Sequence, residues 1–131
     1  MITARLSNYR QSPRKVRLVA NLVKGMPVPK AIAQLTFLAK RASSPLKSLL
    51  MSAVANAQKQ NLTADSLFVK NLVVDKGLVL YRMMPRARGS GARIRKRSSH
   101  VVITLDDIKN MKSTKRRAPK ASKKTASVAT P

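Results

Sequence analysis

The chain of 131 residues contains no cysteine, no tryptophan and no glutamate, and it has a single histidine, His100. Without cysteine there is neither a disulfide framework nor a thiolate metal site, and one histidine nearly excludes a transition-metal cluster. The four aspartates are scattered and make no paired-carboxylate site, and the four glycines form no phosphate-cradling loop. We therefore expect neither catalysis nor a cofactor or metal.

Long apolar runs and aromatic side chains are also scarce. No window approaches the roughly 18 apolar residues of a transmembrane helix, and the start MITARLSNYR has no apolar run of signal-peptide length. The chain has two Phe and two Tyr, too few for the bulky apolar face of a membrane-surface helix or for base-stacking platforms. These absences predict a cytoplasmic protein that makes no membrane contact.

Positive charge dominates what is present. Lys and Arg number 28 against 4 acids, a formal net charge of +24, and no acid precedes Asp65. Such a balance opposes a compact state unless a partner neutralises it. Nucleic acid is the partner that fits best, with an anionic membrane surface as the weaker alternative.

The first 64 residues predict one short strand and three helices. Weak alternation from Ile2 to Tyr9 favours a strand. Ser12 is a typical N-cap, Pro13 suits the first helical position, and Gly25 is placed to end that helix. The helix dipole disfavours cations near a helix start, so we expect the three cations there to serve a ligand. These cations are Arg14, Lys15 and Arg17.

Two further helices follow. A short one restarts at Val28-Pro29, and the next has an apolar stripe at helical spacing that is typical of a buried face. Its stripe residues are Leu46, Leu49, Leu50, Ala53, Val54 and Ala57. Pro45 after Ser44 marks the expected start, and the helix is expected to fray between Lys59 and Thr63.

The second half predicts a long hairpin at about residues 78–104. A strand is expected over 66–75, with a turn or bulge at Lys76-Gly77, and the return strand closes over 100–105. Gly89-Ser90-Gly91 marks the reversal, because glycines supply the positive φ of a tight turn. A two-residue turn would place all the hairpin arginines on one face and Arg86 opposite Arg93. A three-residue turn would send the two strands' arginines to opposite faces.

This hairpin, which we call the arm, carries seven cations and no acid. They are Arg82, Arg86, Arg88, Arg93, Arg95, Lys96 and Arg97. Burial of so many unpaired cations in a core would be very costly, so we expect the arm to leave the body and to reach roughly 30 Å toward a polyanion. An isolated hairpin is marginal in water, so its outer half is expected to become ordered on that ligand. A solvated surface hairpin is the alternative interpretation.

Several segments together resemble the bacterial large-subunit ribosomal protein L22 family, in the right order over about residues 4–106. The most specific stretch is RMMPRARG from Arg82 to Gly89. Others are SPRK with RLVA, LVKG, SAVANA, VDKG and, after the arm's turn, Lys96-Arg97 and SHV. In the family the third helix is already under way at the position of Pro45, so an earlier start or a kink there is the alternative to a start at Pro45.

The resemblance implies an α+β fold of three helices packed on a small antiparallel sheet, with a long protruding β-hairpin. It implies a structural protein that binds several domains of large-subunit ribosomal RNA, contacts neighbouring ribosomal proteins and supports assembly. The hairpin tip would line the nascent-peptide exit tunnel and face the nascent polypeptide. Expected RNA-contacting residues are the helix-start cations, the arm cations and His100. The tip comprises Arg88, Gly89, Ser90, Gly91 and Ala92.

Other classes remain open from the residues alone. Lys, Ala and Pro enrichment after Lys109 would suit a DNA-compacting protein, although nothing favours the dimer that such proteins use. An exported cationic toxin is disfavoured because no signal sequence is visible. We expect one domain over residues 1–108 and a basic, disordered tail over residues 109–131. We expect no homo-oligomer.

Overall fold

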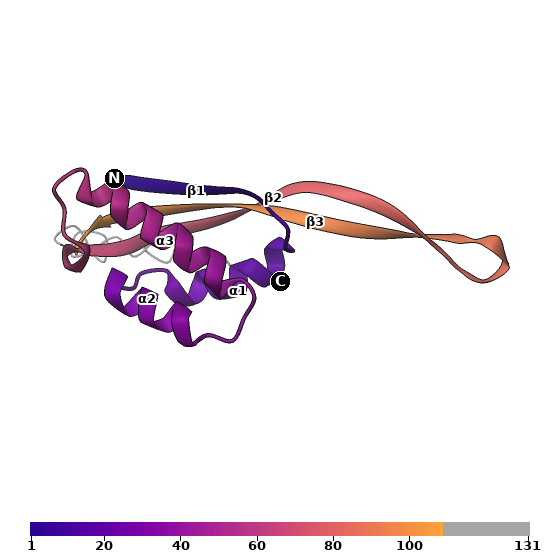
Figure 1. The fold of residues 1–131 in the computed structure, drawn as a ribbon, viewed down its shortest axis with the longest axis horizontal. Helices are drawn as coiled ribbons and strands as arrows, with labels where there is room; N and C mark the ends of the chain where they lie inside the picture. The colour runs from indigo at the N-terminus through magenta and orange to yellow at the C-terminus, as the bar shows by residue number, and fades with distance from the viewer. Residues whose placement is uncertain (109–131) are drawn as a thin grey trace, which may run out of the picture.

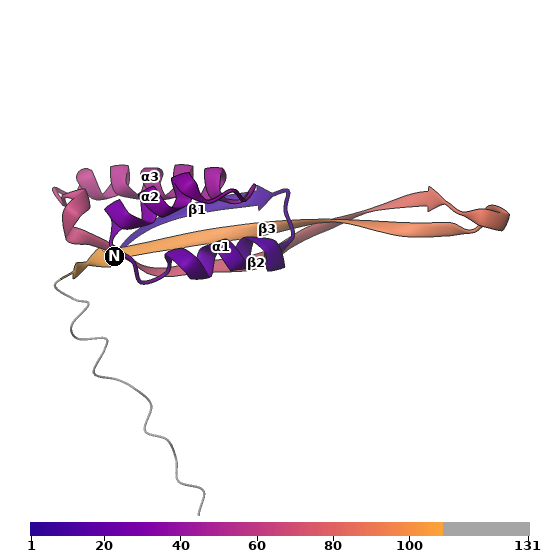
Figure 2. The ribbon, with the colours of Figure 1, turned by 90° about the horizontal axis from the view of Figure 1, so that it is seen from below.

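The computed structural model describes residues 1–108 as three α-helices packed on a three-stranded antiparallel sheet (Figures 1 and 2). The strand order is β1-β3-β2, so the last strand lies in the middle. In chain order the elements are β1 (Ile2–Tyr9), α1 (Pro13–Val23), α2 (Val28–Phe37), α3 (Ser43–Gln58), β2 (Leu67–Pro85) and β3 (Gly91–Asp107). The expected α+β class is confirmed. The division at residue 108 stays a prediction, because the expected tail lies outside the described residues.

The hydrophobic core lies between the helices and one face of the sheet. Alternate residues of the three strands meet across the ladder and are buried or half-buried on this face. These rows are Ile2, Leu105 and Val69; Ala4, Ile103 and Leu72; and Leu6, Val101 and Val74. The helices contribute their apolar stripes, and Val16, Ala31 and Leu50 are fully buried. Burial of this single stripe from each element is what holds the body together.

Helix α1 begins and ends at the residues that the sequence predicted. Ser12 is the N-cap residue of α1, although its side chain makes no capping hydrogen bond, and Pro13 occupies the first helical position. Gly25 follows the helix with φ +81°, where glycine carries no steric penalty. Its N–H donates to the Val69 carbonyl at 2.8 Å, and the Val69 N–H donates to the Met26 carbonyl at 2.9 Å. The connection from α1 to α2 is therefore fastened to the edge strand β2.

The third helix begins two residues earlier than Pro45. It runs without a break from Ser43, so Pro45 lies in its first turn. A proline is tolerated there, because the N–H groups of the first turn have no intrahelical acceptor. The start at Pro45 was therefore wrong, and the earlier start implied by the family resemblance is correct.

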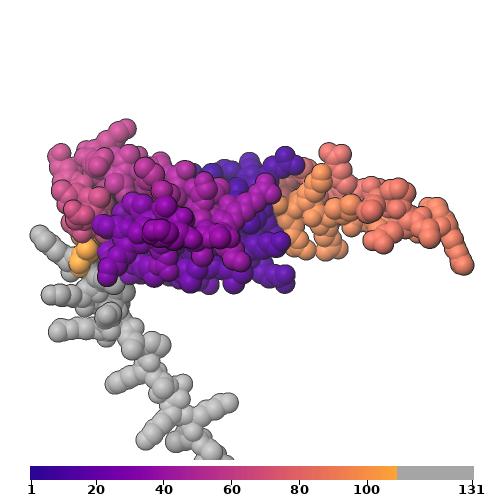
Figure 3. Space-filling view, turned by 60° about the horizontal axis from the view of Figure 1, so that its bottom comes forward, coloured from indigo at the N-terminus to yellow at the C-terminus, as the bar shows by residue number. Residues whose placement is uncertain are grey.

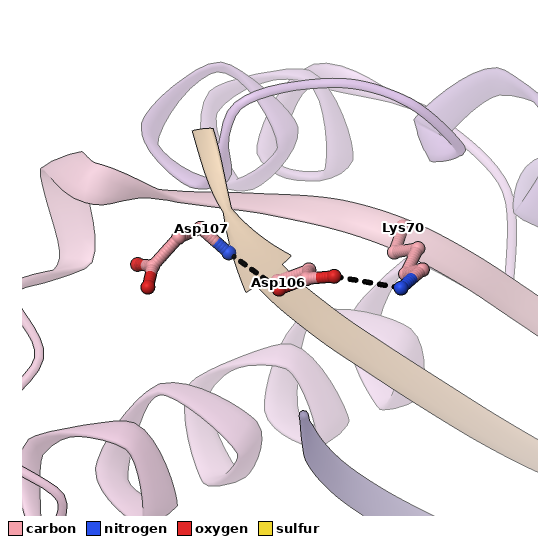
Figure 4. A network of polar contacts seen from close by, with 3 residues as sticks. All are labelled: Lys70, Asp106 and Asp107. Atoms are coloured by element: carbon pink, nitrogen blue, oxygen red, sulfur yellow. Dashed lines mark hydrogen bonds and ion pairs between the residues drawn. The ribbon is translucent and has the colours of Figure 1, made fainter. Parts of the chain in front are cut away.

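Strand β2 contains two bulges. The first lies between Val69 and Asn71, and its extra residue, Lys70, forms an ion pair with Asp106 on β3, with 2.7 Å between Nζ and Oδ2 (Figure 4). The second lies between Lys76 and Val79, where the sequence predicted a turn or a bulge. Two residues of β2, Gly77 and Leu78, there stand against one of β3.

Beyond the second bulge, β2 and β3 continue without β1 or the helices. They form the expected arm, which extends far from the body in the ribbon and in the space-filling view (Figures 1 and 3). The cross-strand pairs run from Val79 with Arg97 to Pro85 with Gly91. The hairpin is thus a direct continuation of the two long strands of the body and is not an appended loop.

Candidate nucleic-acid interface

The arm exposes almost every side chain that it carries. All residues from Leu80 to Gly91 are exposed, including Tyr81 at 59% and Met83 at 66%. None of the arm's seven cations forms an ion pair within residues 1–108. The result is a thin ribbon with unneutralised positive charge along its length, which a polyanion can approach from either side.

Each cation in the regular part of the arm lies opposite an apolar residue. The pairs are Arg82 with Ile94, Met83 with Arg93, Tyr81 with Arg95, Leu80 with Lys96 and Val79 with Arg97. The Arg93 guanidinium also lies 6.0 Å from the centroid of the Tyr81 ring, at the outer limit of a cation–π contact. This register avoids directly opposed like charges, which would destabilise an uncovered hairpin.

The register also separates two flanks with different chemistry, because paired residues share a face and faces alternate along each strand. We call them the arginine flank and the mixed flank. The arginine flank contains Val79, Tyr81, Met83, Arg93, Arg95 and Arg97. The mixed flank contains Leu80, Arg82, Met84, Ala92, Ile94 and Lys96. The arginine flank concentrates three guanidinium groups from one strand, a spacing suited to successive phosphates.

Both turns expected from the Gly-Ser-Gly sequence are wrong. The ladder ends at Pro85 and Gly91, so the reversal uses residues 86–90. The Arg86 N–H donates to the Ser90 carbonyl at 2.8 Å, and the left-handed positions are Arg88 (φ +58°) and Gly89 (φ +71°). An arginine in this conformation is uncommon, which is why the glycine pattern misplaced the turn. The one-faced arrangement of arginines, with Arg86 opposite Arg93, is therefore ruled out. The alternative arrangement, with the arginines of the two strands on opposite faces, is confirmed, because Arg82 lies on the other face from Arg93, Arg95 and Arg97.

The cations at the start of α1 have different environments. Arg14 and Lys15 are exposed in the first turn, which contains no acid. The Arg17 guanidinium instead donates two hydrogen bonds to the Val74 carbonyl, from Nε at 3.0 Å and from Nη2 at 2.8 Å. Arg17 thus connects α1 to β2, a structural role that its sequence position did not indicate. Arg17 is nevertheless an exposed residue, and its guanidinium has further N–H donors.

His100 also takes part in the fold. Its Nδ1 accepts a hydrogen bond from the Asn8 backbone N–H at 3.1 Å, where β1 shifts register and Asn8 has φ +54°. A neutral imidazole that accepts at Nδ1 carries its proton on Nε2. His100 therefore fixes the end of β1 beside the base of the arm, close to Gly77.

The structure adds a concave feature that sequence reasoning missed. An open cleft of about 670 Å³ lies where the end of β1, the α2–α3 loop and the base of the arm meet. It is lined by Asn8, Arg10, Arg41, Leu78, Leu80, Lys96, Arg97 and Ser98. Arg10 and Arg41 were not expected as site residues, because no spacing rule relates two loop positions 31 residues apart.

Two kinds of feature are absent from the described part of the chain. No helix within residues 1–108 is long and apolar enough to cross a membrane. No group of three or more His, Cys, Asp or Glu side chains in the same range could hold a metal ion.

The compact α+β body, the acid-free arm and the cationic cleft define a class of small basic proteins that project a positively charged hairpin. Comparison with known proteins identifies the family. The model of the family described as Ribosomal protein L22p/L17e matches residues 4–106. The chain therefore belongs to the ribosomal protein L22p/L17e family, and the resemblance noted in the sequence is confirmed.

Individual relatives agree over most of their length. "Large ribosomal subunit protein uL22" of Mesoplasma florum is 50% identical over 105 residues, which cover 79% of this chain and 94% of that protein. The protein of the same name from Herpetosiphon aurantiacus is 48% identical over 103 residues, covering 78% and 91%. That of Pelobacter propionicus is 44% identical over 108 residues, covering 82% and 97%.

Proposed function

We propose that this protein is a structural constituent of the large ribosomal subunit, in the cytoplasm, and that it binds large-subunit ribosomal RNA through phosphate contacts. Family membership supports the assignment, and the relatives are themselves named as large ribosomal subunit proteins. The role is architectural: the protein joins several RNA domains, packs beside neighbouring ribosomal proteins as a single copy, and thereby supports assembly.

The observation that carries this proposal is the arm. Seven exposed cations without an acidic partner on a ribbon that buries almost nothing form a surface that is stable chiefly when phosphate covers it. The arginine flank and the mixed flank allow RNA to pack on both sides. A compact reader of base sequence would instead present a helix or stacked aromatics, and the chain has neither on the arm.

Residues fall into three groups in this proposal. Arg14, Lys15 and Arg17 bind RNA at the start of α1, and His100 lies at the base of the arm. Along the arm, the phosphate contacts come from Arg82, Arg86, Arg88, Arg93, Arg95, Lys96 and Arg97. The tip, from Arg88 to Ala92, lines the peptide exit tunnel and meets the nascent polypeptide with small neutral residues around one arginine.

A salt titration tests the phosphate contacts. The double variant Arg93→Gln/Arg95→Gln removes two exposed guanidiniums from the arginine flank. For binding to large-subunit ribosomal RNA, the slope of log K against log salt should become shallower by about 1.4 to 1.8, the contribution of two phosphate contacts. Met83→Gln is the matched control, because Met83 is the exposed cross-strand neighbour of Arg93 and carries no charge.

Sedimentation tests the assembly. In moderate salt the protein in a lysate should migrate with the large subunit, and Met83→Gln should do the same. An unchanged salt slope in the double variant would contradict the arm as a phosphate contact. Sedimentation with chromosomal DNA, or with neither ribosomal subunit, would contradict the proposed function as a whole.

A further inference from the structure

The shape of the cleft at the base of the arm is set by hydrogen bonds between residues that are distant in sequence. Asn8, with a positive φ, lies in the bulge between Leu6 and Tyr9 near the end of β1, and its N–H donates to His100 Nδ1. The next residue, Tyr9, donates from its hydroxyl to the Arg41 carbonyl at 3.3 Å. Burial raises the pKa of Tyr9 above its ordinary 10.0, opposed by the charge of Arg41, so this hydroxyl keeps its proton at neutral pH. The α2–α3 loop is thereby held over the arm base.

The cleft combines an apolar surface with a cationic rim. Leu78 and Leu80 are 69% and 55% exposed, which is unusual for leucines beside a packed body. The residues that line the cleft also include four cations and no acid: Arg10, Arg41, Lys96 and Arg97. Neither the Arg10 nor the Arg41 side chain makes a hydrogen bond or ion pair within residues 1–108, so both guanidiniums keep their donors for a ligand.

A ligand that satisfies both features has a flat, weakly polar ring joined to phosphate. The volume of about 670 Å³ is within the range of roughly 300–1,000 Å³ that encloses one small organic group. Asn8 at the wall offers an amide with both donors and an acceptor. Lys96 and Arg97 belong to the cation series of the arm, so an RNA strand that follows the arm arrives at this cleft.

We propose that the cleft binds a single unstacked nucleotide of the RNA, its base against Leu78 and Leu80 and its flanking phosphates on Arg10 and Arg41. This inference rests on the proposed RNA-binding function and adds a defined site to it. Unlike the arm contacts, which follow a charged backbone, the cleft would select a place where the RNA strand turns a base outward. It would therefore fix the direction of the arm relative to the body's RNA contacts.

The absence of cysteine makes a site-directed crosslink specific. Ser7→Cys introduces the single thiol of the chain at an exposed position next to Asn8 of the cleft wall and outside the proposed contacts, and a photoreactive azidophenacyl group is attached to it. After incorporation into large subunits and irradiation, primer extension should find a crosslink confined to one or two nucleotides of large-subunit ribosomal RNA. The same label in an Arg10→Gln/Arg41→Gln background should lose about nine-tenths of that crosslink, because two charge-assisted hydrogen bonds are gone.

The control is Lys24→Gln/Lys30→Gln with the same label, which removes two exposed cations away from the cleft. It should keep the crosslink and its position. A crosslink to a protein, one spread over many nucleotides, or one that survives Arg10→Gln/Arg41→Gln overturns the nucleotide site while leaving incorporation intact. Failure of the unlabelled wild-type protein to enter the subunit overturns the proposed function and the site together.

Discussion

The same two strands build two regions with opposite surroundings. In the body, β2 and β3 bury Leu72 and Ile103 beneath the helices, whereas in the arm every residue from Leu80 to Gly91 is exposed. The backbone ladder is continuous through both regions apart from the bulges. Backbone hydrogen bonding between β2 and β3 is therefore common to the body and the arm, and it does not explain a difference in stability between them. Side-chain burial stabilises the body, whereas the arm buries almost none of its side chains.

The largest difference between the regions should appear when a leucine is shortened in each. Leu50→Ala, at a side chain with no exposure, should lower the free energy of unfolding by about 2–5 kcal/mol through lost burial and a cavity. Leu80→Ala, at a side chain 55% exposed, should change it by less than about 0.5 kcal/mol. Urea denaturation followed by circular dichroism measures both, and equal losses would show that the arm shares the body's cooperative core.

The junction between the regions is the next place to perturb. A Cβ at Gly77 would lie 2.6 Å from Ser98 Oγ and 3.2 Å from the Ser98 carbonyl carbon. The Ser98 hydroxyl donates to the Leu78 carbonyl and cannot turn away without losing that bond. We expect Gly77→Ala to cost about 1–3 kcal/mol, as overpacking does, and to accelerate amide exchange in the arm more than in the body.

Gly89→Ala is the control for that experiment. No atom lies within 4 Å of a Cβ there, so its cost arises only from the φ of +71° and should be about 1 kcal/mol, confined to the tip. If Gly77→Ala changed amide exchange no more than Gly89→Ala, close packing at the bulge would not matter.

The smallest expected effect distinguishes two buried hydroxyls. Ser43, 3% exposed, donates from Oγ to the Leu38 carbonyl at 2.9 Å, and Ser43→Ala should cost about 1 kcal/mol. Ser99, fully buried beside the arm base, has no hydrogen-bond partner for its Oγ. Ser99→Ala should therefore change the unfolding free energy by no more than about 0.5 kcal/mol, or raise it. Thermal unfolding of the two variants compares them directly, and an equal loss would indicate a partner for Ser99.

The sequence predicted the body better than the arm tip, for physical reasons. Apolar periodicity and the Pro13 and Gly25 signals identify α1, because they act through neighbouring residues. The turn was misplaced because Arg88 adopts a conformation usually left to glycine. The face of each arginine depends on that register, so the two-residue turn also predicted the wrong faces, whereas the alternative with arginines on both faces was correct. In contrast, the positive charge of the arm follows directly from its amino-acid composition and does not depend on the register.

The candidate site divides in the same way. The cations of the arm and the helix start were identifiable from composition and run length. Two features depend on residues that are distant in sequence. Arg17 donates hydrogen bonds to the Val74 carbonyl, and Arg10 and Arg41 line the same cleft. Local patterns carry no information about such contacts.

The bulge at Gly77 and Leu78 is the point at which the arm leaves the body, so its geometry sets the angle between them. It inserts one residue into β2 and shifts the register by one, so it sets both the direction of the arm and the cross-strand partners within it. The extended residues 79–85 span roughly 20 Å at about 3.3 Å each, so a rotation of about 10° at this bulge would move the far end of the ladder by about 3.5 Å. A small change of angle at two residues thus becomes a displacement of several ångströms at the far end. Where the tip arrives is determined at the base.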